Sequence, residues 1–121
     1  MEHVFTILGN AVDLNSYINA ERTNRYMAAK IKREEMERIM WQLPAMKLTG
    51  PVHLSFQAYV ENMRKDPDNI YVIFVKFFLD SLKEKGIIEN DGQKQIGRIV
   101  LEPVLHCPDP SMTVTVTYAE D

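Results

Sequence analysis

Residues 52–60, VHLSFQAYV, alternate strictly between apolar and more polar side chains. Every second side chain of a β-strand points to the same face, so this alternation is typical of a strand that is buried on one side only. Three other segments have strand character, namely 3–8, 94–104 and 112–118, and the last of them carries strictly alternating threonines. The chain is therefore expected to form a sheet of four strands.

Two long segments between these strands favour helices. Residues 17–43 are helix-forming throughout and stop before Pro44 and Gly50-Pro51. Residues 70–85 form the second predicted helix, with Gly86 as the glycine that commonly follows a helix C-terminus. The first helix carries an approximate apolar stripe, made of Tyr26, Ala29, Met36, Ile39, Met40 and Leu43.

The resulting order, β-α-β-α-β-β, indicates an α+β fold with a mixed four-stranded sheet and two main helices. With 121 residues and a hydrophobic content of 45%, residues 1–121 suit one domain with one modest core. Helix 70–85 has aromatic residues on more than one face. We expect a homodimer to cover some of them, although a helix fully buried in its own chain is an equal alternative.

The cysteine count and the apolar segments limit where the protein can work. The single cysteine, Cys107, cannot form a disulfide within the chain, and no basic-then-apolar leader is present, which predicts a cytoplasmic protein. The longest apolar stretch, Ile70–Leu79, is about half the length that crosses a bilayer and contains Lys76. The sequence therefore predicts no membrane partner.

The stretch DPDN, residues 66–69, places two carboxylates immediately before the apolar helix. Pro67 disfavours a helical backbone at the preceding residue, so Asp66 is expected to be extended and to project its side chain in the same direction as Asp68. Mg²⁺ favours carboxylate and water oxygens. Asp91, in the turn after the helix, is the candidate for a third ligand.

Lys76 interrupts the apolar helix and lies nearly two helical turns beyond Asn69, close to the same face. It could therefore reach back toward the carboxylates. Structural alternatives stay open for each position: Asp68 or Asn69 as a helix cap, Asp91 as part of a tight turn with Gly92, and Lys76 as the partner of Asp80 across one turn.

The run DPDNIYVIFVKFFLDSLKEKGIIENDGQKQI, residues 66–96, resembles the signature segment of the RusA-type Holliday junction resolvases. The shared features are D-x-D-N, a helix with a lysine and Leu-Asp-x-Leu, then a glycine, an apolar pair and an acidic turn. The segment LNSYINAERTNRYMAAKIKREE, residues 14–35, is similar to a segment of phage-encoded members of the family. Together the two segments cover roughly half of the chain.

The resemblance implies a homodimeric endonuclease that depends on Mg²⁺, with Mn²⁺ as an alternative cation. Such an enzyme resolves four-way DNA junctions by paired nicks during recombination and repair. By position, Asp66, Asp68 and Asp91 match the metal-binding acids of the family, and Lys76 matches its active-site lysine. One or two cations held by these acids would activate a water beside the phosphate and compensate charge on the phosphoryl and leaving oxygens, and Lys76 would stabilise the developing charge.

The charge distribution suits a DNA partner although the net charge is −3. Between Arg22 and Lys47 there are seven basic and three acidic residues, a local balance of +4. Lys and Arg at helical spacing can follow a phosphate backbone, and the candidates are Arg22, Arg25, Lys30, Lys32 and Arg33. Alternatively, this is a solvated face that Glu34, Glu35 and Glu37 balance.

The sequence leaves two other functions open. Asn90 stands where many members of the family have a second acid, which motivates a non-catalytic dimer of the same fold that binds branched DNA or regulates a phage function. A purely structural interaction module is the other alternative. The sequence holds no G-x-S-x-G, no Gly-rich phosphate loop and no H-E-x-x-H, and its three histidines, His3, His53 and His106, are scattered.

Overall fold

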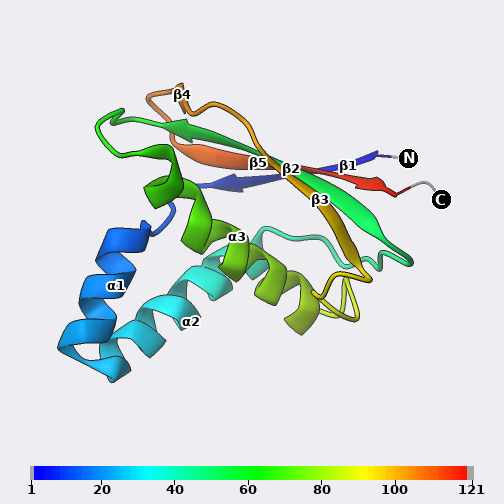
Figure 1. The fold of residues 1–121 in the computed structure, drawn as a ribbon, viewed down its shortest axis with the longest axis horizontal. Coiled ribbons are helices and arrows are strands. Elements are labelled where there is room, and N and C mark those ends of the chain that lie inside the picture. The colour runs from blue at the N-terminus through cyan, green and yellow to red at the C-terminus, as the bar shows by residue number, and fades with distance from the viewer. Residues whose placement is uncertain (1, 120–121) are drawn as a thin grey trace.

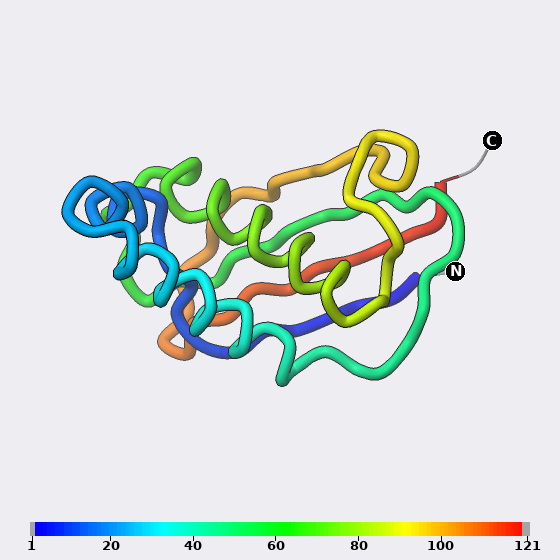
Figure 2. Tube along the Cα trace, turned by 90° about the horizontal axis from the view of Figure 1, so that it is seen from below, coloured from blue at the N-terminus to red at the C-terminus, as the bar shows by residue number. Residues whose placement is uncertain are grey.

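Three helices cover one face of a five-stranded mixed sheet in the computed structural model, which describes residues 2–119 (Figures 1 and 2). The α+β class and the single domain agree with the sequence prediction. The elements in chain order are β1 (Glu2–Leu8), α1 (Leu14–Thr23), α2 (Arg25–Trp41), β2 (Val52–Val60), α3 (Pro67–Glu84), β3 (Ile96–Leu101), β4 (Leu105–His106) and β5 (Ser111–Tyr118).

The sheet has the order β1-β5-β2-β3, and β4 pairs with the end of β2. β5 is antiparallel to both of its neighbours, whereas β2 and β3 are parallel and are joined through α3. The strand predicted at 52–60 is confirmed at both ends. The strand predicted at 94–104 is instead two strands, β3 and β4, because Pro103 has no backbone N–H to continue the ladder. The sheet therefore has five strands rather than four.

The single helix predicted at 17–43 is also wrong, because Asn24 divides it into α1 and α2. Asn24 has an extended backbone with φ of −165°, and its N–H still closes the last turn of α1 on the carbonyl of Ala20. Its side chain accepts a hydrogen bond of 2.8 Å from the backbone N–H of Tyr26 and so caps the start of α2. One asparagine thus ends one helix and begins the next.

The core lies between α3 and the inner face of the sheet. Phe56 of β2 meets Phe78 of α3 edge to face, with ring centroids 5.7 Å apart, and Phe74 stacks on Phe78 at 5.8 Å. Such aromatic pairs add to the free energy gained by burying their area. All three rings are fully buried within the chain, so the aromatic residues of α3 do not need a second subunit to cover them.

Tyr71 joins α3 to β2 and to the residue that follows β3. Its hydroxyl accepts a hydrogen bond of 2.8 Å from the N–H of Ala58 and donates one of 2.7 Å to the carbonyl of Glu102. Burial of this ring raises the pKa of the Tyr71 hydroxyl above its usual value. The hydroxyl therefore stays protonated and keeps both bonds.

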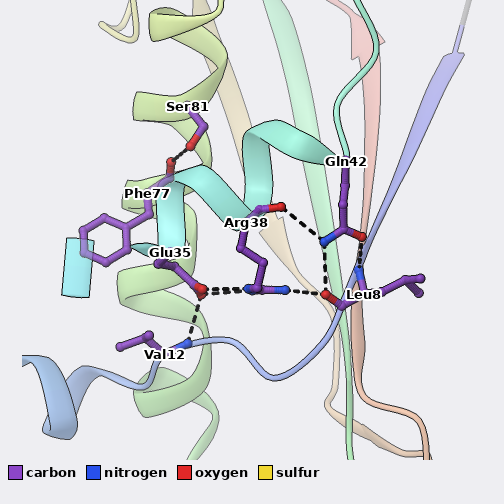
Figure 3. Close-up of polar contacts among 7 residues, drawn as sticks. All are labelled: Leu8, Val12, Glu35, Arg38, Gln42, Phe77 and Ser81. Carbon is purple, nitrogen blue, oxygen red and sulfur yellow. Dashed lines mark hydrogen bonds and ion pairs between the residues drawn. The ribbon is translucent and has the colours of Figure 1, made fainter. Parts of the chain in front are cut away.

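A polar cluster joins α2 to the end of β1 and the loop that follows it (Figure 3). Glu35 is only 4% exposed, and its carboxylate accepts hydrogen bonds from Arg38 at 2.8 and 3.0 Å and from the N–H of Val12 at 3.0 Å. Arg38 and the side-chain amide of Gln42 both donate to the carbonyl of Leu8, and the Leu8 N–H donates to Gln42. The cluster satisfies the polar groups at the end of an edge strand.

None of the helices formed by residues 2–119 is long and apolar enough to span a membrane.

Gly86 follows the C-terminal end of α3 and has a left-handed backbone, with φ of +74°. The sequence prediction that Gly86 follows the helix C-terminus is confirmed.

Candidate functional site

Asp66 and Asp68 flank Pro67 at the start of α3. Asp66 is extended, with φ of −68° and ψ of 148°, as the following proline requires. Its side chain makes no capping hydrogen bond, and Asp68 lies in the first turn of the helix. Both residues are exposed, and within residues 2–119 neither carboxylate takes part in an ion pair. The pair is thus available to a ligand from solvent.

Asp91 does not join this pair in the single chain. α3 runs without a break for 18 residues, about 27 Å at 1.5 Å per residue, and Asp91 follows its far end. Figure 2 shows the green turn before α3 and the yellow segment after it at opposite ends of the molecule. No three His, Cys, Asp or Glu side chains gather into a metal-binding group anywhere in residues 2–119. The expected return of Asp91 toward the other two acids does not occur, because the helix between them is long and straight.

Lys76 and Asp91 instead line one open hollow between α2 and α3. The Lys76 ammonium lies 3.2 Å from one carboxylate oxygen of Asp80, and Lys32 lies 3.3 Å from the other. Lys76 therefore forms the pair with Asp80 that was its structural alternative, and it points away from the start of α3. This hollow brings together Lys32, Lys76 and Asp91, three of the residues singled out in the sequence.

The neighbourhood of the acid pair contains residues that the sequence did not indicate. Lys65 pairs with Asp13 at 2.6 Å, and Asp13 also accepts a hydrogen bond of 2.7 Å from the N–H of Ser16 as the cap of α1. Desolvation would raise the pKa of the Asp13 carboxyl, but these hydrogen bonds outweigh it and hold the pKa below its usual value. Asp13 is thus an ionised structural group. It borders a cavity of about 290 Å³, lined also by Lys65 and Ile70.

Asn69 also proves to be structural, though not as a cap of its own helix. Its side-chain oxygen accepts a hydrogen bond of 2.8 Å from the backbone N–H of Asn15. The start of α1 and the start of α3 are therefore held side by side. The only sequence signal for this contact is the position of both asparagines near helix N-termini.

The five predicted DNA-binding residues lie in different surroundings. Arg22, Arg25, Lys30 and Arg33 are exposed, and Lys30 makes only a loose pair with Glu34 at 3.8 Å. Lys32 faces α3, where its ammonium lies 5.9 Å from the centre of the Phe77 ring. Four of the five side chains are thus free to meet a phosphate backbone.

No protein-family model matches the chain, and no curated protein matches it. Mg²⁺ usually keeps several waters and is held by one or two carboxylates together with substrate phosphates, rather than by a complete protein cage. Asp66 and Asp68 are two exposed carboxylates of the kind that such a site uses.

Proposed function

We propose that this chain is a Mg²⁺-dependent endonuclease of branched DNA, of the RusA type that its sequence resembles, and that it resolves four-way junctions by paired nicks. The observation that carries the proposal is the pair of exposed carboxylates, Asp66 and Asp68, at the start of α3. An aspartate at the N-terminus of a helix commonly caps it by accepting a hydrogen bond from a backbone N–H. The side chain of Asp66 makes no such capping bond. Mn²⁺ is the alternative cation.

In this proposal the start of α3 binds the scissile phosphate together with the cation. Bound there, Mg²⁺ would supply charge compensation on the phosphoryl oxygens and a more acidic water. Asp66 and Asp68 would hold the cation, and the N-terminal end of α3 would favour the negative phosphate through its free N–H groups and dipole. Lys65 forms an ion pair with Asp13, so the two side chains together add no net charge beside the start of α3.

The exposed basic residues of α1 and α2 would carry the DNA backbone. Each phosphate that a Lys or Arg neutralises releases counterions, so binding of this kind weakens steeply with salt. In the proposal Lys32 of α2 and Lys76 of α3 lie beside this surface, where the two helices face each other. Their shared partner Asp80 holds both ammonium groups in place.

The test is incubation with a synthetic four-way junction at increasing Mg²⁺ concentration. We expect paired nicks that require the cation, and we expect no cleavage of a linear duplex of the same sequence under the same conditions. Gel separation of the labelled strands measures both. Junction binding without cleavage at any Mg²⁺ or Mn²⁺ concentration would contradict the proposed nuclease activity. It would instead support a protein that binds junctions without cutting them.

A non-catalytic protein that binds branched DNA is the second candidate, and the separation of Asp91 from Asp66 and Asp68 favours it. A family site that needs all three acids within one chain is not assembled here. The same titration decides between the two functions, because binding can be measured in EDTA.

The proposal includes a homodimer, since two coordinated nicks are most simply made by two sites related by a two-fold axis. The exposed apolar side chains at the β3 edge, Ile99 and Leu101, and Val72 of α3 are the surface we assign to it, with exposed fractions of 41%, 46% and 47%. Light scattering is expected to give twice the 14.0 kDa of one chain. Ile99→Lys should give the single-chain mass, whereas a wild-type monomer that still cuts junctions would refute the dimer.

A further inference from the structure

Tyr26 is an aromatic residue on the surface of α2. It is 74% exposed in the first turn of α2, and the neighbouring Met27 is 50% exposed. The apolar stripe expected from the sequence put Tyr26 in the core, but the buried residues of α2 are Ala28, Glu35, Met36 and Ile39. The break at Asn24 turns Tyr26 outward.

The position of the Tyr26 ring is nevertheless defined. The side chain of Asn24 holds the backbone N–H of Tyr26 at 2.8 Å, which fixes the start of the helix. The guanidinium carbon of Arg25 lies 5.4 Å from the centre of the ring, a cation–π contact. The two neighbours thus form one unit with an aromatic surface and a positive charge.

This unit stands on the corner where α1 meets α2, which projects from the body of the molecule at the end away from both termini (Figure 1). Between Ala20 and Arg33 there are five basic side chains and one acidic one, Glu21. An exposed aromatic ring in strongly basic surroundings complements a ligand that carries both negative charge and flat rings.

We propose that Tyr26 is a stacking platform for an unpaired base of the DNA, with Arg25 and Arg22 on the adjoining phosphates. The inference rests on the proposed DNA-binding function and adds that this corner recognises an unpaired stretch of branched DNA, in addition to its paired arms. Proteins that hold single strands combine a basic surface with aromatic side chains on which bases stack, and every base has a face suited to such contact. A fully paired duplex would meet the same corner through its phosphates alone.

Trp41 provides a matched comparison within the same helix. It is even more exposed, at 88%, but lies at the opposite end of α2. The nearby Arg38 is already engaged by Glu35 and Leu8. Trp41 is therefore an exposed aromatic residue without free basic neighbours in its own turn, and we assign no base to it.

The experiment measures binding by fluorescence anisotropy in EDTA, where no cation-dependent cleavage occurs. The probes are a labelled thymidine oligonucleotide of about 12 nucleotides, within the range of single-strand site sizes, and an abasic oligonucleotide of equal length and charge. Tyr26→Ala is expected to weaken binding of the thymidine strand roughly 5- to 100-fold, about the range for loss of one stacked base. The abasic strand should lose less than about twofold, because it offers phosphates without bases.

Three variants complete the design. Tyr26→Phe keeps the ring and should bind like wild type, and Trp41→Ala should also bind like wild type. Arg33→Ala should weaken both strands equally and reduce the salt slope by about one contact. Thermal melting by circular dichroism should be unchanged in all of them, because each altered side chain is exposed.

Two outcomes separate this inference from the function on which it rests. If wild type binds the four-way junction and the thymidine strand, but Tyr26→Ala binds both as tightly, the stacking role is wrong and the DNA-binding function stands. If wild type binds neither the strands nor the junction at low salt, the DNA-binding function itself fails, and the stacking role fails with it.

Discussion

Replacing Asp68 with asparagine is expected to reduce junction cleavage by roughly 100-fold or more while leaving junction binding intact. A bound cation supplies several kcal/mol of charge stabilisation in the transition state, and each loss of about 1.4 kcal/mol slows the reaction tenfold. The asparagine side chain would keep the size of the aspartate and one oxygen but lose the charge that holds the cation. Single-turnover rates at saturating protein, measured across Mg²⁺ concentrations, test this expectation.

The loss should not arise from unfolding. Asp68 is exposed and lies in the first helical turn, where a carboxylate contributes only about 0.5 kcal/mol through the helix dipole. Asp109 is the matched control, because it too is an exposed aspartate in a proline-containing turn. Asp109→Asn should cut at the wild-type rate. Unchanged cutting by Asp68→Asn at saturating Mg²⁺ would show that the cation is held elsewhere.

Asp91→Asn tests whether Asp91 helps Asp66 and Asp68 to hold the cation. Since α3 separates Asp91 from the acid pair within one chain, we expect this substitution to slow cleavage far less than Asp68→Asn does. A loss equal to that of Asp68→Asn would mean that Asp91 does reach the cation. The two-carboxylate site proposed for one chain would then be incomplete.

The strands were predictable where local pattern and tertiary burial agree. Residues 52–60 alternate in the sequence, and β2 is buried on one face over the same residues, because its inner side lies under α3. The division of 94–104 at Pro103 follows from chemistry that was readable in the sequence. The division of 17–43 was harder to foresee, since Asn24 stands in a helix-forming stretch and only its capping bond distinguishes it.

The candidate site was predictable in its local part only. That Asp66 is extended before Pro67 follows from two adjacent residues. The partner of Lys76 depends on which faces of α2 and α3 meet, because Asp80 is shared with Lys32 from the other helix. The position of Asp91 depends on the length of α3 and on the direction that the chain takes in the turn after this helix. Contacts of these kinds are set by the assembled fold.

Glu35 shows how a pattern in the sequence can be present and still be misread. It lies seven residues after Ala28 and four before Ile39, so helical spacing places it on the buried face of α2. From the sequence, Glu35 was considered only as one of three acids that would balance the basic residues around it if this face is solvated. The structure instead buries Glu35 and gives it Arg38 and the N–H of Val12 as partners.

Glu35→Ala is therefore expected to lower the free energy of unfolding by about 3–5 kcal/mol, the cost of removing one partner from a buried ion pair. It would leave the Arg38 guanidinium without its counter-charge and the Val12 N–H without an acceptor. Urea unfolding followed by circular dichroism measures the change, and with a slope of roughly 1–3 kcal/mol per molar the midpoint should fall by more than about 1 M.

The adjacent residue supplies the control for this prediction. Glu34 has a side chain that is 62% exposed, and it pairs only loosely with Lys30 at 3.8 Å, so Glu34→Ala should cost less than about 0.5 kcal/mol. Glu35→Gln keeps an oxygen for the Val12 N–H and should fall between the two. Equal midpoints for Glu34→Ala and Glu35→Ala would mean that the cluster at the end of β1 does not hold α2 to the sheet. A large loss confined to Glu35 would make this buried pair, rather than the exposed charges of α2, the part of the helix on which folding depends.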